Sequence, residues 1–113
     1  MDRVNNKFLD KVTCADVVDV LPQIDSESID LVCTDPPYNL GKDYGNTIDA
    51  KAWHEYEQFT IGWLSQCRRV LKRTGSIYVF MGVRFISKLY LLLEDMGFLF
   101  NGWITWEVVS RVF

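Results

Sequence analysis

The chain has few residues that could hold a metal ion or form disulfides. Its three cysteines, Cys14, Cys33 and Cys67, lie far apart, and His54 is its single histidine. A structural zinc site needs about four such ligands, usually in closely spaced pairs, and a disulfide framework uses an even number of cysteines. We therefore expect no metal site, and free thiols in a reducing cytoplasm.

The sequence also lacks a segment apolar enough for a membrane. The first residues contain no apolar stretch of the kind found in signal peptides, and the most apolar run, Leu89–Leu93, is ended by Glu94 and Asp95. A membrane-spanning helix needs ~20 apolar residues. We expect a soluble protein that has no membrane partner.

Basic charge is scarce as well. Lys and Arg number 12 against 15 Asp and Glu, so the net charge is −3. A protein that binds nucleic acid by itself usually carries a basic excess, because its cations displace counterions from the phosphates. Any nucleic-acid role is therefore expected to be local, or shared with a partner.

What the chain does have is the composition of a folded domain. It is 113 residues long, with 49% hydrophobic and 14% aromatic residues. That length suits one domain, and a chain of this size buries only roughly two-thirds of the surface that it exposes when unfolded. The sequence therefore predicts a single domain, residues 1–113, with some apolar surface left over.

Strand and helix patterns alternate along the chain. Ile29–Thr34 and Ser76–Met81 are predicted strands, because each has an unbroken apolar middle, Leu31-Val32-Cys33 and Ile77-Tyr78-Val79-Phe80. Such runs are typical of strands that are covered on both faces of a parallel sheet. Apolar residues recur every three or four positions in three predicted helices, Val17–Leu21, Trp53–Leu71 and Phe85–Met96. This alternation predicts an α/β fold with a mainly parallel sheet flanked by helices.

Residue types at the ends of the elements predict their boundaries. Asp49 is the predicted N-cap of the long helix, and Gly75 is its predicted C-cap. The tail over 98–113 is rich in aromatic and β-branched residues and predicts one or two strands. Within this tail, Trp103 and Trp106 are expected to lie in the core.

The first apolar strand is followed by Asp35-Pro36-Pro37-Tyr38. Ligands of parallel sheets bind beyond the carboxyl ends of the strands, which is where this segment falls. A double proline also makes a rigid turn that has no further function. The combination of a carboxylate, a carbonyl without a competing N–H beside it and an aromatic ring favours a catalytic segment.

This segment carries a family resemblance. The sequence from Ile29 to Gly45, IDLVCTDPPYNLGKDYG, resembles the catalytic segment of S-adenosylmethionine-dependent DNA amino-methyltransferases, and the similarity continues more loosely through Trp103-Ile104-Thr105-Trp106. The resemblance implies a partial Rossmann-like methyltransferase sheet, S-adenosylmethionine as the cofactor and double-stranded DNA as the substrate. It also implies a cytoplasmic restriction-modification protein of a prokaryote or phage, which methylates DNA at specific sites.

The resemblance implies a role for each residue of the motif. Asp35 and the Pro36 carbonyl each accept one N–H of an exocyclic amino group, which localises the nitrogen lone pair for attack on the methyl sulfonium. Pro37 helps to lock this geometry, and Tyr38 stacks on the base after it has flipped out of the duplex. Aspartate at the first position favours adenine-N6 over cytosine-N4 as the methylated position.

Further site residues follow from the same resemblance, and each has a second interpretation. Asp16, together with Asp35, is expected to contact the cofactor, but Asp16 is equally an N-cap for the helix that follows it. Lys42 and Tyr44 are expected to contact the base or the DNA, and the alternative is a charged, solvated loop. His54 is expected at the surface, without a catalytic role.

The resemblance also identifies parts that this chain does not contain. It has no Gly-rich Phe-x-Gly-x-Gly turn, and only 34 residues precede Asp35. The motif order resembles the permuted class, in which the catalytic half comes first and the recognition region and the cofactor half follow. We therefore expect the catalytic half alone, dependent on a complementing chain or a homo-oligomer. The alternative is a non-catalytic remnant that oligomerises or binds a partner. An RNA or protein-glutamine methyltransferase fits less well, because those enzymes place the cofactor turn upstream.

Overall fold

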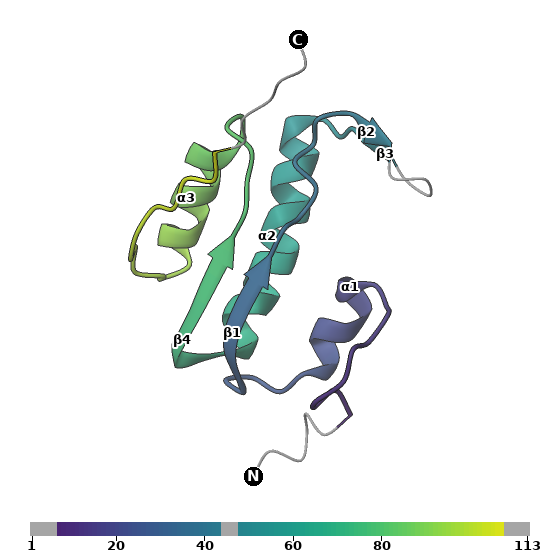
Figure 1. Cartoon of the computed structure of the whole chain (residues 1–113), viewed down its shortest axis with the longest axis vertical. Coiled ribbons are helices and arrows are strands. Elements are labelled where there is room, and N and C mark those ends of the chain that lie inside the picture. Colours follow the sequence, from purple (N-terminus) through teal and green to yellow (C-terminus); the bar gives the residue numbers. More distant parts are fainter. Residues whose placement is uncertain (1–6, 44–47, 108–113) are drawn as a thin grey trace.

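The centre of the fold is a parallel sheet of two strands, β1 (Ile29–Thr34) and β4 (Leu71–Val79) (Figure 1). The computed structural model describes residues 7–43 and 48–107. In the register of the two strands, Leu31 lies beside Ser76 and Cys33 beside Tyr78. The parallel strands predicted from the two apolar runs are confirmed, and the chain has a partial α/β, Rossmann-like fold.

The helices connect and cover these strands. The chain begins with the short helix α1 (Val17–Val20) and the 3-10 helix η2 (Leu21–Gln23) before it enters β1. Helix α2 (Trp53–Val70) then links β1 to β4, and α3 (Ile86–Asp95) follows β4. Figure 1 shows α2 behind the two strands and α3 beside β4. The three predicted helices are therefore present, within a few residues of their expected ends.

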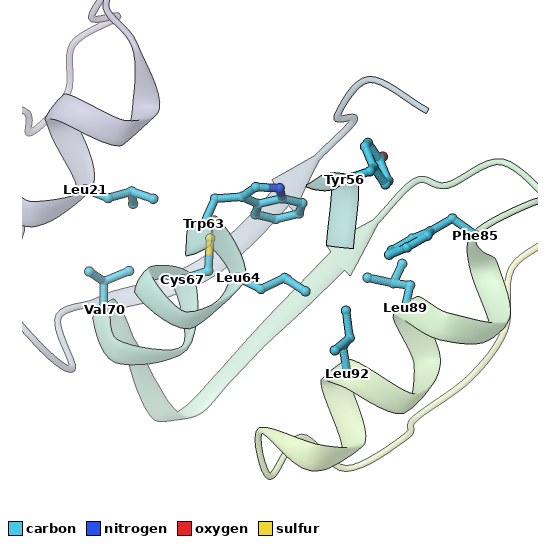
Figure 2. Close-up of a cluster of buried hydrophobic side chains, with 9 residues drawn as sticks. All are labelled: Leu21, Tyr56, Trp63, Leu64, Cys67, Val70, Phe85, Leu89 and Leu92. Atoms are coloured by element: carbon cyan, nitrogen blue, oxygen red, sulfur yellow. The ribbon is translucent and has the colours of Figure 1, made fainter. Parts of the chain in front are cut away.

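The hydrophobic core lies where α2, α3 and η2 meet the sheet. Figure 2 shows its nine buried members: Leu21, Tyr56, Trp63, Leu64, Cys67, Val70, Phe85, Leu89 and Leu92. Five of them come from α2, at positions 56, 63, 64, 67 and 70, with the spacing expected for one face of a helix. Burial of the Cys67 thiol raises its pKa to about 11, because the thiolate is poorly solvated there.

The start of α2 differs from the prediction. Asp49 is not its N-cap, because this residue lies in strand β3 (Ile48–Asp49), which pairs antiparallel with β2 (Lys42–Asp43). The cap position is held by Ala52, which makes no side-chain cap hydrogen bond. An aspartate near a helix start predicts a cap only when the backbone turns at that residue, and here the turn comes three residues later.

The end of α2 also differs, because the helix passes into β4 without a connecting turn. Leu71 follows the last helical residue and already belongs to the strand, so Gly75 lies inside β4 and is not a C-cap. A Cβ atom at Gly75 would be 2.9 Å from Leu71 Cδ2 and 3.1 Å from the Asp30 carbonyl oxygen. The glycine is therefore needed for close approach of β4 to β1, and this requirement depends on a neighbouring strand.

One face of the sheet is exposed, which contradicts the prediction that the strands are covered on both sides. Val32 and Ile77 face α2 and pack against the core. The opposite face carries the apolar side chains of Leu31, Cys33, Tyr78 and, just beyond β4, Phe80, together with the polar Ser76 beside Leu31. All five are exposed in the part of the chain that the structure describes. We call the four apolar residues the open sheet face.

The tail after α3 contains no strand over residues 98–107. Helix α3 ends at Asp95, and Gly97, just after the C-cap Met96, adopts a φ of +89° that favours glycine. Trp103 and Trp106 are exposed, so their predicted place in the core is wrong, although the Trp106 ring lies 6.0 Å from that of Phe80. The predicted strand residues beyond 107 lie outside the described part of the chain. A strand forms only beside a pairing partner, and residues 98–107 have none in this structure.

Candidate active site

The Asp35–Tyr38 segment leaves the sheet at the carboxyl end of β1. Thr34, the last residue of β1, pairs with Val79 at the end of β4, and its carbonyl accepts the Phe80 N–H at 3.0 Å. The two parallel strands therefore end side by side, and the segment begins at their common edge (Figure 1). This is the edge at which parallel sheets bind their ligands, as the sequence predicted.

The carboxylate and the ring of the segment lie together. The Tyr38 hydroxyl donates a hydrogen bond to Asp35 Oδ1, while the Asp35 side chain stays exposed. The half-buried Tyr38 ring packs over Gly82, where an added Cβ would be 3.5 Å from three atoms of the tyrosine. The segment thus presents an oriented carboxylate at the surface with an aromatic ring beside it.

The Pro37 carbonyl is anchored by Tyr56 of α2. Its hydroxyl donates a hydrogen bond to the Pro37 carbonyl and lies 3.5 Å from Met81 Sδ. The Tyr56 side chain is almost completely buried, and its ring meets that of Phe85 edge to face at 4.8 Å. The helical pattern identified Tyr56 only as a core residue. A signal was present, because a buried tyrosine needs a hydrogen-bond partner that a leucine or phenylalanine at the same position would not.

A second anchor follows the motif at Asn39. Its Oδ1 accepts the Lys51 N–H at 2.6 Å, and its Nδ2 donates to the Lys51 carbonyl at 2.9 Å. Asn39 is buried and has a φ of +63°, a left-handed conformation that asparagine tolerates better than most residues. The two hydrogen bonds join the chain on either side of the β2–β3 hairpin. Sequence reasoning missed this residue, because its partner is a backbone segment twelve positions away.

The other residues predicted for the site lie outside the Asp35–Tyr38 segment, and one of them lies outside the described part of the chain. Asp16 caps α1 through a 2.9 Å hydrogen bond from the Val18 N–H to Oδ1, which confirms the N-cap interpretation. Helix α1 runs in the direction opposite to β1 (Figure 1). Lys42 belongs to strand β2, and Tyr44 lies outside the described residues. His54 is exposed on α2, as predicted.

The arginines at the end of α2 bind other parts of the same chain. Arg69 donates to the Leu21 carbonyl at 2.8 Å and to Ser26 Oγ at 3.0 Å, and Arg68 donates to the Met96 carbonyl at 3.0 Å. These hydrogen bonds tie α2 to η2 and to the end of α3. Over residues 7–43 and 48–107, no three His, Cys, Asp or Glu side chains are grouped to hold a metal ion. Within the same ranges, no helix has the length and hydropathy of a membrane span.

Tyr56→Phe tests the anchor beneath the motif. This substitution keeps the ring contacts but leaves the Pro37 carbonyl without its hydroxyl donor, so we expect the free energy of unfolding to fall by about 1–2 kcal/mol. Urea denaturation followed by circular dichroism measures the change. Tyr90→Phe is the matched control, because the Tyr90 hydroxyl bonds an exposed glutamate, Glu94, at 3.4 Å. Equal losses in the two variants would show that Tyr56 does not anchor the segment.

Comparison with known proteins places the chain among DNA-modifying enzymes. Residues 29–112 match the family model described as DNA methylase, of the N6 and N4 methyltransferase type. The chain is 50% identical over 103 residues to the Type II methyltransferase M.HpaI of Haemophilus parainfluenzae, an alignment that covers 90% of this chain and 33% of the relative.

Two further relatives are more distant. The chain is 29% identical over 121 residues to the Type II methyltransferase M.HinfI of Haemophilus influenzae, covering 95% of this chain and 34% of that protein. It is 30% identical over 99 residues to the Type II methyltransferase M1.MboII of Moraxella bovis, covering 88% and 37%. The chain thus spans about a third of the length of the curated relatives that it matches.

Proposed function

Because the chain belongs to the DNA methylase family, we propose that it supplies the catalytic half of a site-specific DNA methyltransferase. The proposed reaction transfers a methyl group from S-adenosylmethionine to the N6 amino group of adenine, as part of restriction-modification in the cytoplasm. The observation that carries the proposal is the Asp35–Tyr38 segment, anchored at the carboxyl end of β1 with its carboxylate exposed and its ring alongside.

The chemistry needs a polar site that changes the geometry of a weak nucleophile. The lone pair of an exocyclic amino group is delocalised into the ring, and two hydrogen-bond acceptors on its N–H groups draw the nitrogen toward tetrahedral geometry. We assign these acceptors to the Asp35 carboxylate and the Pro36 carbonyl. The Tyr38 hydroxyl holds Asp35 Oδ1, so Oδ2 is the oxygen assigned to the amino group.

The base itself is assigned to the Tyr38 ring. A base inside a duplex cannot reach a carboxylate on the protein surface, so the target nucleotide must leave the stack. Stacking on an aromatic ring recovers about 1–3 kcal/mol of the stacking that is lost. Tyr38 fits this task, because its ring is fixed over Gly82 beside the carboxylate.

Two carboxylates of the described chain are assigned to the cofactor. S-adenosylmethionine supplies a methyl group on a positively charged sulfonium. Asp16 and Asp35 are exposed carboxylates suited to its polar and cationic groups. Gly82, the glycine after β4, has the Tyr38 side chain 3.5 Å from an added Cβ, so it does not open a free cradle. We therefore propose that a complementing polypeptide provides the Gly-rich cofactor turn and the DNA recognition region.

A methyl-transfer assay tests this function. The chain is co-expressed with the part of M.HpaI that lies outside the alignment, and the purified material is incubated with radiolabelled S-adenosylmethionine and duplex DNA. Nucleoside mass spectrometry is expected to find N6-methyladenine. Detection of N4-methylcytosine instead would show that the methylated base is cytosine. The absence of product, together with no cofactor binding by calorimetry, would favour the non-catalytic alternative.

A further inference from the structure

The open sheet face has the composition of an interface. Leu31 is 56% exposed, Tyr78 47% and Phe80 39%, and Cys33 lies between them with an exposed thiol. The register places Cys33 beside Tyr78, so the side chains of both strands form one continuous surface. Contiguous apolar surface of this kind on a small protein marks a place where another surface binds.

The usual packing of parallel sheets also indicates that another surface binds this face. Parallel strands are almost always covered on both faces, and here only the face toward α2 is covered in the described structure. A sheet of two strands is also too small to be stable without packing on its faces. The described structure therefore leaves uncovered a sheet face of a kind that parallel strands usually bury.

The chemistry of the face selects the kind of partner. None of its four side chains is charged. Lys72 and Asp30, near the starts of β4 and β1, are paired with each other at 3.0 Å. A surface without free cations does not attract nucleic-acid phosphates. It fits the apolar side of a helix, as in the layered packing of α/β folds.

We propose that the open sheet face binds the polypeptide that corresponds to the unmatched part of the relatives, through an apolar helix surface laid across β1 and β4. This inference rests on the proposed function for the choice of occupant. The matched relatives carry about two-thirds of their length outside the alignment, which is ample chain for such a layer. The face also continues into the Asp35 segment, so the same partner lies against the carboxylate and assembly completes the site.

Protection of Cys33 measures this contact directly. In a Cys14→Ser background, Cys33 is the reactive thiol at pH 8, because Cys67 is buried and its pKa is raised to about 11. The chain is co-expressed with the unmatched part of M.HpaI, and alkylation of the Cys33 peptide is followed by mass spectrometry. We expect alkylation to be at least about tenfold slower in the complex than in the chain alone, because a thiol in an interface reacts only when the interface opens.

A charged substitution on the face provides the second measurement. Leu31→Asp would bury a carboxylate in the interface and is expected to weaken co-purification by about tenfold or more. Leu91→Asp is the matched control, because Leu91 is 51% exposed, belongs to α3 and is not part of the open sheet face. Circular dichroism of both variants shows whether each still folds. If Leu31→Asp unfolds, Cys33 protection in the otherwise unchanged chain decides the question.

The outcomes separate this inference from the proposed function. A complex that protects Cys33 but transfers no methyl group supports the interface and contradicts the proposed activity. Lack of a complex, an unprotected Cys33 or equal binding by the two aspartate variants overturns the inference. Protection of Cys33 in the chain alone, with a dimer in analytical ultracentrifugation, also overturns it, because the occupant is then a second copy.

Discussion

Replacing Asp35 by alanine is expected to lower methyl transfer by the assembled enzyme by about 10²- to 10³-fold or more, while S-adenosylmethionine affinity changes little. The substitution removes the proposed acceptor of an amino N–H, and the loss of one preorganised polar group at a reacting atom typically costs that much. Single-turnover transfer and calorimetric titration of the cofactor measure the two quantities separately. Asp35→Asn keeps one oxygen acceptor without the charge. Its rate of methyl transfer is expected to lie between that of Asp35→Ala and that of the unmodified chain.

The control for Asp35 is Asp30, an exposed carboxylate in the preceding strand β1. Asp30 pairs with Lys72 at 3.0 Å on the surface, and exposed ion pairs of this kind contribute only about 0–1 kcal/mol to stability. Asp30→Ala is therefore expected to transfer methyl groups at nearly the normal rate. Normal turnover by Asp35→Ala, or an equal loss in both variants, would contradict the role assigned to Asp35.

Replacing Leu64 by alanine is expected to reduce the free energy of unfolding by about 2–5 kcal/mol. Leu64 is fully buried at the centre of the core, on the face of α2 that meets the sheet and α3 (Figure 2). The loss comprises the transfer free energy of the removed methyl groups and the cost of the cavity. Since whole domains are stable by only about 5–15 kcal/mol, this variant should be largely unfolded under mild denaturing conditions.

Urea denaturation followed by far-ultraviolet circular dichroism measures the Leu64 effect. Leu91→Ala is the matched control, since this leucine is 51% exposed, and its substitution should change stability by no more than about 0.5 kcal/mol. A Leu64→Ala variant as stable as Leu91→Ala would show that the core is not organised around α2.

Local periodicity predicted most of the fold. The recurrence of apolar residues after Trp53 identified α2 and its buried side. The apolar runs identified both strands, because each element imposes its own period on the side chains that it buries. The Asp35–Tyr38 segment and its context also predicted the family, which the match over residues 29–112 confirms. The roles given to individual residues of the segment stay predictions.

The errors arose where the answer depended on a distant neighbour. Gly75 allows the close approach of the Asp30 carbonyl, which belongs to another strand. The buried Tyr56 hydroxyl is satisfied by the Pro37 carbonyl, which accepts its hydrogen bond. Neither partner is close in sequence. The burial of Trp103 and Trp106 was inferred from their residue type, but an aromatic side chain is buried only where a second surface meets it.

The Asn39–Lys51 pair has an evolutionary consequence. Its two hydrogen bonds, at 2.6 and 2.9 Å, join the two ends of the eleven-residue segment 40–50. The backbone next to Tyr38 and the backbone before α2 are therefore held together without a contribution from residues 40–50. Closing a somewhat longer loop costs little, since each doubling of length adds only about 0.6 kcal/mol. Insertions and substitutions between Asn39 and Lys51 can therefore accumulate without moving the catalytic segment, which makes this stretch a place where related enzymes can diverge in what they contact.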